Sequence, residues 1–258
     1  MAELLTIKLL IVAILGGVLP ALVWLWFWHR QDRECPEPKG LVMISFFAGM
    51  AIVFFVLPVQ KLIIAFFPTI TGFIDILAIK LSLIPPSADV LKNFLLASSE
   101  EIGKYLTVFL IAFHSKYFDE PIDAVIYLIT AALGFTAMEN VLYLLKDLTH
   151  SGGLETIING NMRFLGATIL HTVSSAFVGI ALAFSFYAPR FIKGIVISIG
   201  LLVAILLHTH FNLSIIEAYG TINVLSVFSR YWVVIIGIII LIGIIKYINT
   251  RKKTCPIQ

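Results

Sequence analysis

Two adjacent carboxylates and one ammonium lie within an apolar stretch of the sequence. Glu100 and Glu101 are followed by Lys104, and residues 91–113 are otherwise mostly apolar. Residues three and four apart lie on one side of a helix, so Lys104 can reach either carboxylate. Near the middle of a membrane-spanning helix, each such charge costs about 2.5 to 3.5 kcal/mol. Other groups must therefore compensate these charges.

Three more ionisable side chains interrupt other apolar stretches. Glu139, His171 and His208 each belong to a separate stretch. Counted from the nearest charged residue toward the predicted outer end, these three residues and Glu100 lie seven to nine positions inside their stretches. At about 1.5 Å per residue, this is a depth of roughly 10 to 14 Å. The pattern predicts that four helices bring carboxylates and imidazoles to one level of a membrane.

Helical spacing selects between the two histidines of the last polar cluster. His208 and Asn212 are four residues apart and share a helix face, whereas His210 points about 160° away from His208. We therefore favour His208 and Asn212 as functional residues.

Such a cluster could perform three kinds of chemistry. Carboxylates and imidazoles can activate water for hydrolysis, either directly as a general base or through a bound Zn²⁺. They can also relay protons or bind a cation in a transporter. A catalytically silent membrane scaffold with a polar network is the third alternative.

The composition defines the elements that must position these residues. The chain has 258 residues, 60% of them hydrophobic and 13% charged, whereas soluble proteins are about half apolar and about a quarter charged. This composition predicts an all-α integral membrane protein, a polytopic helix bundle. The net charge is only +3, and the basic residues are scattered, so we expect no nucleic-acid partner. The lipid bilayer is the expected surroundings of the helices and one of the partners.

Seven spans are predicted, with eight as the alternative. Residues 66–86 are apolar but contain prolines and charges, which favours an interfacial or re-entrant segment over an eighth span. One set of loops holds ten lysines and arginines and the other holds five, which places the N-terminus outside and the C-terminus in the cytoplasm. We treat 1–258 as a single membrane domain with a motif-bearing core at about 88–217. The predicted spans are 9–28, 40–59, 87–113, 121–145, 164–188, 192–216 and 231–247.

Several motifs in correct order resemble the PrsW family of intramembrane proteases. Residues 100–104 look like its EExxK motif, residues 118–123 its FDEPLDG segment, and residues 132–140 its GFxxxEN motif. His171 matches the histidine of GHALFTG, and residues 208–212 resemble HAxW(D/N). Two positions depart mildly from the pattern, because Leu170 and Ala124 stand where the family has glycine.

The resemblance implies an intramembrane endopeptidase that cuts membrane-anchored proteins in a prokaryotic cell membrane. The depth of the ionisable residues and the loop charges place the cut near the outer side of that membrane. The family is related to the CAAX prenyl endopeptidases, and some members act on anti-sigma factors in regulated proteolysis. By this analogy Glu100 or Glu101, aided by Glu139, activates the water, and we favour Glu100. Lys104 then sets the charge of the pair, and without a metal His208 or Asn212 polarises the carbonyl. If Zn²⁺ is bound, the expected ligands are Glu101, Glu139, His171 and His208.

Overall fold

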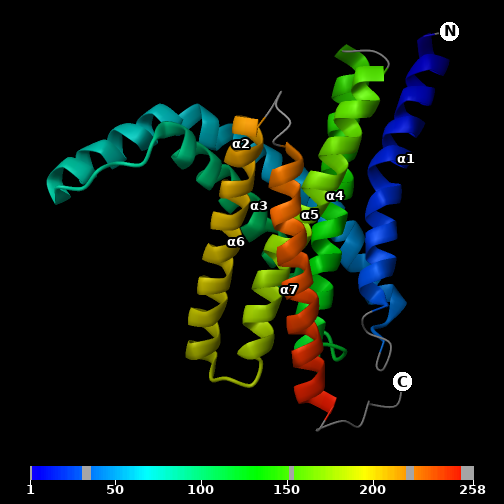
Figure 1. Cartoon of the computed structure of the whole chain (residues 1–258), viewed down its shortest axis with the longest axis vertical. Helices are drawn as coiled ribbons and strands as arrows, with labels where there is room; N and C mark the ends of the chain where they lie inside the picture. The colour runs from blue at the N-terminus through cyan, green and yellow to red at the C-terminus, as the bar shows by residue number, and fades with distance from the viewer. Residues whose placement is uncertain (1, 31–35, 151–153, 219–223, 251–258) are drawn as a thin grey trace.

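The chain folds as a bundle of long helices. The computed structural model describes residues 2–30, 36–150, 154–218 and 224–250, and within these ranges it contains seven helices and no strand. The prediction of an all-α bundle is therefore confirmed. α1 begins at one end of the bundle and α7 ends at the other (Figure 1). The helices are α1 (Ala2–His29), α2 (Lys39–Leu81), α3 (Ala88–Ile111), α4 (Pro121–His150), α5 (Leu154–Phe184), α6 (Arg190–Ala218) and α7 (Val224–Thr250).

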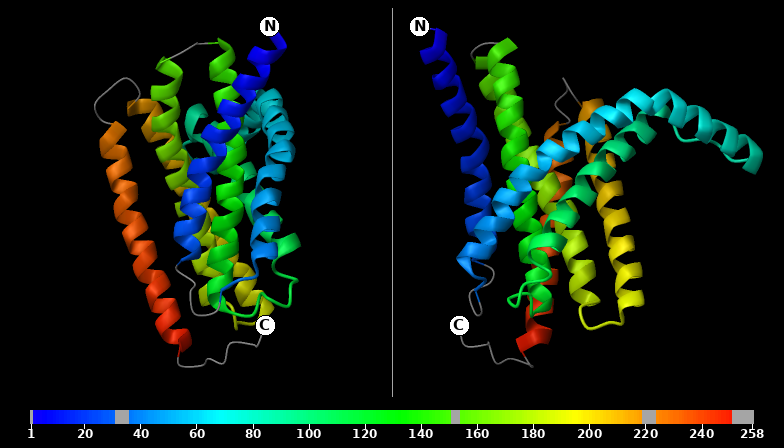
Figure 2. Two further views of the ribbon diagram at one scale, coloured as in Figure 1. Left: turned by 90° about the vertical axis from the view of Figure 1, so that its right-hand side faces the viewer. Right: turned by 180° about the vertical axis from the view of Figure 1, so that it is seen from behind.

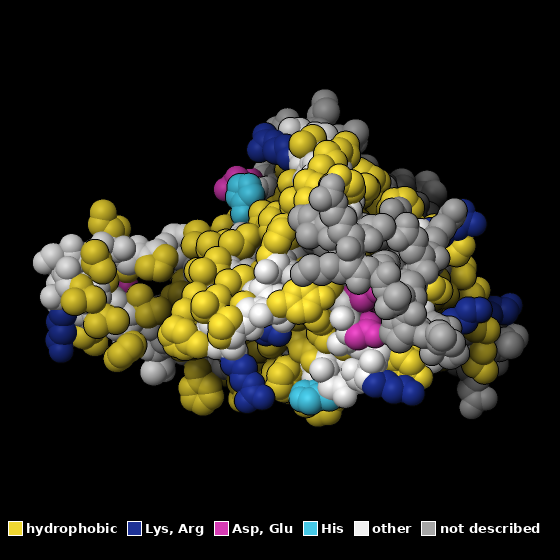
Figure 3. Space-filling view, turned by 90° about the horizontal axis from the view of Figure 1, so that it is seen from below, with side chains coloured by type: hydrophobic (Ala, Val, Ile, Leu, Met, Phe, Trp, Pro, Cys, Tyr) yellow, Lys and Arg dark blue, Asp and Glu magenta, His cyan; other side chains and the backbone are white. Residues whose placement is uncertain are grey.

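Hydrophobic length and surface identify an integral membrane protein. Among the described residues, five helices are long and apolar enough to cross a membrane: α1, α2, α4, α5 and α6. α7 contributes the shorter apolar stretch Ser229–Ile244, and α3 carries five charged residues. Seen from the end where α5 turns into α6, hydrophobic side chains cover much of the surface, with lysines and arginines scattered among them (Figure 3).

α4 forms the centre of the bundle. It packs against α1, α2 and α5, and 94% of its apolar window is buried, compared with 17% for α1 and 22% for α6. Glycines let the helix backbones approach closely: Gly134 lies against the Phe46 carbonyl of α2, and Gly49 of α2 lies against Ala131.

The closest of these contacts gives a stability prediction. A Cβ atom on Gly134 would lie 1.9 Å from the carbonyl oxygen of Phe46, and the backbones of α2 and α4 would have to separate. We expect Gly134→Ala to lower the free energy of unfolding by about 1 to 3 kcal/mol, as overpacking does. Denaturant titration in mixed micelles would measure it.

Gly243→Ala in α7 is the matched control. Nothing lies within 4 Å of a Cβ at that position, so the substitution changes only helix propensity, which favours alanine by up to about 1 kcal/mol. Equal stabilities of the two variants would contradict the close approach of α2 and α4.

α2 is longer than the sequence predicted. The predicted second span ends at 59, with 66–86 as a separate segment, but α2 continues without interruption to Leu81 and includes Pro58 and Pro68. A proline removes one backbone donor and bends a helix. In apolar surroundings the remaining backbone groups are still best satisfied within a helix, so the helix bends without ending.

The second half of α2 and the start of α3 form an arm, residues 61–96. α2 curves out of the bundle, and α3 returns alongside it (Figures 1 and 2). The arm exposes large apolar side chains, such as Phe73 at 67% and Ile84 at 95%. α3 begins after Ser87, whose hydroxyl accepts a hydrogen bond from the Val90 amide at 3.4 Å, as is typical of an N-cap residue. The arm delivers the charged motif of α3 back into the bundle.

The acidic segment before α4 is tied to the loop before α2. Asp123 Oδ2 accepts hydrogen bonds from the backbone amides of Asp119 and Glu120, at 2.9 and 2.7 Å. The Tyr127 hydroxyl donates to the Glu37 carboxylate. Burial raises the pKa of Glu37 above its ordinary value of 4.5, although the hydrogen bonds from Asp123 and Tyr127 act in the opposite direction and lower it. Asp123 and Tyr127 lie roughly 20 Å along α4 from Glu139, so this contact is separate from the surroundings of Glu139.

Candidate active site

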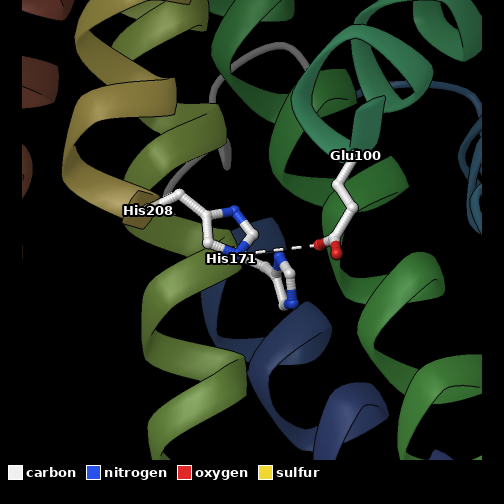
Figure 4. A group of neighbouring side chains, drawn as sticks. All are labelled: Glu100, His171 and His208. Carbon is white, nitrogen blue, oxygen red and sulfur yellow. Dashed lines mark ion pairs between the residues drawn. The ribbon is translucent and has the colours of Figure 1, made fainter. Parts of the chain in front are cut away.

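The ionisable residues from separate helices meet inside the bundle. They are Glu100 and Glu101 of α3, Glu139 of α4, His171 of α5 and His208 of α6. In Figure 4 the side chains of Glu100, His171 and His208 point toward one another from their three helices. All except Glu139 are buried, and the Glu139 side chain is 18% exposed. Lipid cannot solvate these groups, so the helices turn them toward one another.

Glu101 is held from three sides. Its Oε1 atom lies 2.6 Å from Lys104 Nζ and 2.7 Å from His208 Nδ1. The Ser174 hydroxyl lies 2.9 Å from the same oxygen and also 2.9 Å from the Leu170 carbonyl. These donors come from α3, α5 and α6, so Glu101 joins the three helices.

The contact with Glu101 determines how the His208 ring is used. A carboxylate only accepts hydrogen bonds, so His208 Nδ1 carries a proton, and in the neutral imidazole Nε2 keeps a lone pair. Nε2 lies 3.6 Å from Glu100 Oε2, as the dashed line in Figure 4 marks. Glu101 thereby orients a ring nitrogen that can accept a proton or bind a metal.

Lys104 connects a second chain of contacts. It is fully buried, and its Nζ atom lies 3.0 Å from His171 Nδ1. His171 Nε2 lies 3.0 Å from Glu139 Oε2. Because an ammonium can only donate, His171 accepts at Nδ1 and donates from Nε2 to Glu139. The Phe135 ring packs against His171 and lies 5.4 Å from Lys104 Nζ, which closes the site toward α4.

Glu100 keeps one oxygen open. Its Oε1 atom accepts a hydrogen bond of 2.8 Å from Gln60 Nε2 of α2. Its Oε2 atom is buried and has no hydrogen-bond partner in the described part of the chain, and the same is true of Glu101 Oε2. A buried oxygen without a partner is costly unless water or an added ligand meets it. Glu100 Oε2, which faces the His208 lone pair, is the better placed of the two for chemistry.

The sequence did not identify Gln60 or Ser174. Gln60 is a polar residue at the end of an apolar stretch, and Ser174 lies one helical turn after His171, which are weak signals. Asn212 is half-buried one turn beyond His208, and His210 is exposed. Asn212 takes no part in the contacts above. The preference for His208 over His210 agrees with their burial.

The motifs that form this site also carry the family relationship. A family model described as "PrsW family intramembrane metalloprotease" matches residues 37–244. The chain belongs to the PrsW family. The matched range of this PrsW family member contains all five helices that build the site, α2 to α6. The resemblance seen in the motifs is therefore confirmed.

Several relatives of the chain are named "Protease PrsW". "Protease PrsW" of Geobacillus kaustophilus is 27% identical over 176 residues, which are 68% of this chain and 66% of that protein. "Protease PrsW" of Clostridioides difficile is 23% identical over 238 residues, 92% of each chain. "Protease PrsW" of Bacillus subtilis is 26% identical over 133 residues, 50% of this chain and 52% of that protein. No solved structure is significantly similar to the chain.

The site of this PrsW family member has suitable donors for a divalent cation. Ligand atoms of Glu100, His171 and His208 lie within 4.8 Å of one another. With the three glutamates ionised and one ammonium beside them, two negative charges remain for a cation to balance. The ligand set expected from the sequence names Glu101 and Glu139 in place of Glu100. In the structure these two glutamates instead accept hydrogen bonds from the two imidazoles, as carboxylates around metal-binding histidines do.

Proposed function

We propose that this protein is an intramembrane endopeptidase that uses Glu100 to activate the attacking water. The observation that carries the proposal is the buried Glu100 Oε2 atom, which has no hydrogen-bond partner among the described residues and lies 3.6 Å from His208 Nε2. A water lying to one side of this pair, within hydrogen-bond reach of both atoms, would meet two proton acceptors. The PrsW family assignment supports peptide-bond hydrolysis as the reaction.

The steps follow from the roles of the side chains. Glu100 Oε2 takes a proton from the water while the water oxygen bonds to the scissile carbonyl carbon. Glu100 then gives this proton to the amide nitrogen as the carbon–nitrogen bond breaks. His208 Nε2 accepts a hydrogen bond and orients the water. In this tautomer His208 does not donate to the carbonyl oxygen, so the Asn212 amide is the donor for that oxygen when no metal is bound.

A metal, when bound, supplies a Lewis acid that polarises the scissile carbonyl. Glu100 Oε2 and His208 Nε2 are the open ligand atoms for it, and a Glu100 that binds the metal through Oε2 would activate the water through the metal instead of as the base described above. His171 is the third residue of the group, although both of its ring nitrogens are in hydrogen bonds. Zinc suits this mixture of carboxylate and imidazole donors.

The proposed substrate is a membrane-anchored protein. The site lies among helices that lipid surrounds, so a peptide bond must reach it from within or beside the bilayer. We place the protein in a bacterial cell membrane as one membrane domain, with its N-terminus outside, its C-terminus in the cytoplasm and the site toward the outer side. Cleavage of anti-sigma factors in regulated proteolysis is one role that fits this placement.

A cleavage experiment tests the proposal with two histidines of one helix. The wild-type protein, His208→Ala and His210→Ala would each be reconstituted in liposomes with membrane proteins extracted from the expression host. Mass spectrometry would then count new protein termini. We expect new termini with wild type and His210→Ala, because His210 is exposed, and their loss with His208→Ala. New termini that persist with His208→Ala, or are missing with wild type, would overturn the proposal.

Metal content would be measured on the same three proteins. We expect about one equivalent of zinc in wild type and His210→Ala and less in His208→Ala, since His208 Nε2 is an open ligand atom. Full activity after chelation, in protein shown to be metal-free, would favour the mechanism in which Asn212 polarises the carbonyl.

A further inference from the structure

Gln60 reaches from α2 into the candidate active site. Its Nε2 atom donates to Glu100 Oε1 at 2.8 Å, across forty residues of sequence. Gln60 is half-buried, whereas its neighbours Val59 and Lys61 are exposed. The amide is therefore the group of this helical turn that faces the bundle and meets the functional carboxylate.

This hydrogen bond fixes the orientation of the Glu100 carboxylate. Among the described residues, Gln60 is the one side chain that donates a hydrogen bond to Glu100. Glu101, by contrast, is held by three side chains, those of Lys104, His208 and Ser174. With Oε1 held, the carboxyl plane is set, and Oε2 is the oxygen 3.6 Å from His208 Nε2. Without this hydrogen bond the carboxylate could rotate about its terminal bond, because that torsion is broad.

The backbone that carries Gln60 is itself held in place. Val56, one turn earlier, is buried with Val53 against Phe135 of α4. The Val56 side chain also lies only 2.9 Å from the position that a Cβ of Gly103 would occupy. α2 and α3 are therefore in close contact two to three residues after the two glutamates. A polar group on a backbone packed in this way is preorganised. The second half of α2 leaves the bundle as the arm (Figure 2).

We propose that Gln60 is a positioning residue of the active site, which holds Glu100 so that its second oxygen faces His208. The inference rests on the proposed peptidase function. Gln60 does not touch the reacting atoms and acts through Glu100.

Steady-state kinetics of Gln60→Leu test the proposal. The substrate would be the single-span protein that yields the most abundant new terminus in the liposome experiment. Leucine has a similar volume and no donor, so we expect kcat to fall about 10- to 100-fold, as for a misplaced catalytic group. KM should change little, because Gln60 does not contact the substrate. Gln60→His restores an N–H donor and should recover most of kcat.

Thr71→Val on the arm is the matched control. In the described part of the chain, its hydroxyl bonds to carbonyls of its own helix, those of Phe67 and Pro68, so kcat should stay at the wild-type value. The inference alone is overturned if Glu100→Gln is inactive while Gln60→Leu, measured per folded molecule, keeps the wild-type kcat. The proposed function itself falls if Glu100→Gln cleaves as well as wild type.

Discussion

Glu100→Gln is expected to reduce kcat/KM at least about 10²- to 10⁴-fold, the usual contribution of a general base. The glutamine keeps the volume of the side chain and can still accept the hydrogen bond from Gln60 at its carbonyl oxygen. Its amide cannot take a proton from water. The free energy of unfolding should be unchanged or slightly higher, because a buried oxygen without a partner is removed. Cleavage kinetics and denaturant titration on the same preparation would measure both quantities.

Glu101→Gln is the matched comparison. This substitution changes the carboxylate that joins Lys104, His208 and Ser174, so both activity and stability should fall. The two adjacent glutamates should therefore differ in the effect of their substitution. Glu100→Gln should lower activity alone, and Glu101→Gln should lower both activity and the free energy of unfolding. Wild-type kinetics of Glu100→Gln would exclude Glu100 as the base, and a large loss of its stability would show a structural role.

Lys104→Met should lower the free energy of unfolding by about 3 to 5 kcal/mol, the usual effect of removing one partner of a buried ion pair. The substitution leaves Glu101 without its ammonium, which lies 2.6 Å away at 1% side-chain exposure. It also removes the donor to His171 Nδ1. Denaturant titration in mixed micelles would measure the loss.

Lys92→Met provides the control on the same helix. Lys92 is exposed, so the same change of side chain should shift stability by no more than about 0.5 kcal/mol. The double variant Lys104→Met with Glu101→Gln should be less destabilised than the sum of its two single variants, since no unpaired carboxylate remains. Full additivity would show that the two groups do not stabilise each other.

The helices could be predicted from the sequence, but the course of the second could not. Apolar runs separated by prolines and charges predict seven helices, and the bounds of α3 and α6 agree with the prediction to within two residues. α1, α5 and α7 begin seven to ten residues before their predicted starts, because polar residues that look like loops continue these helices. Pro58 and Pro68 look like the limits of a span, yet α2 continues through both. Whether a proline ends or bends a helix depends on the surroundings of the freed carbonyl, which the sequence does not specify.

Local spacing predicted the contacts within one helix of the site. Lys104 and Glu101 are three residues apart and form the expected pair, and the separation of 160° between His208 and His210 leaves one buried and one exposed. The contacts of His171 with Lys104 and Glu139 depend on how α3, α4 and α5 are rotated against each other. Such rotations follow from packing at residues such as Gly134, which carry no chemical signal in the sequence.

The pairing of Lys104 with Glu101 also matters while the chain is still being synthesised. α3 leaves the ribosome before α6, and His208 is 107 residues downstream of Glu101. At synthesis rates of about 5 to 20 residues per second, α3 waits roughly 5 to 20 s for this partner. During that time Lys104 neutralises Glu101 from within the same helix. The pairing therefore lowers the net charge that the motif carries before the remaining helices of the site exist.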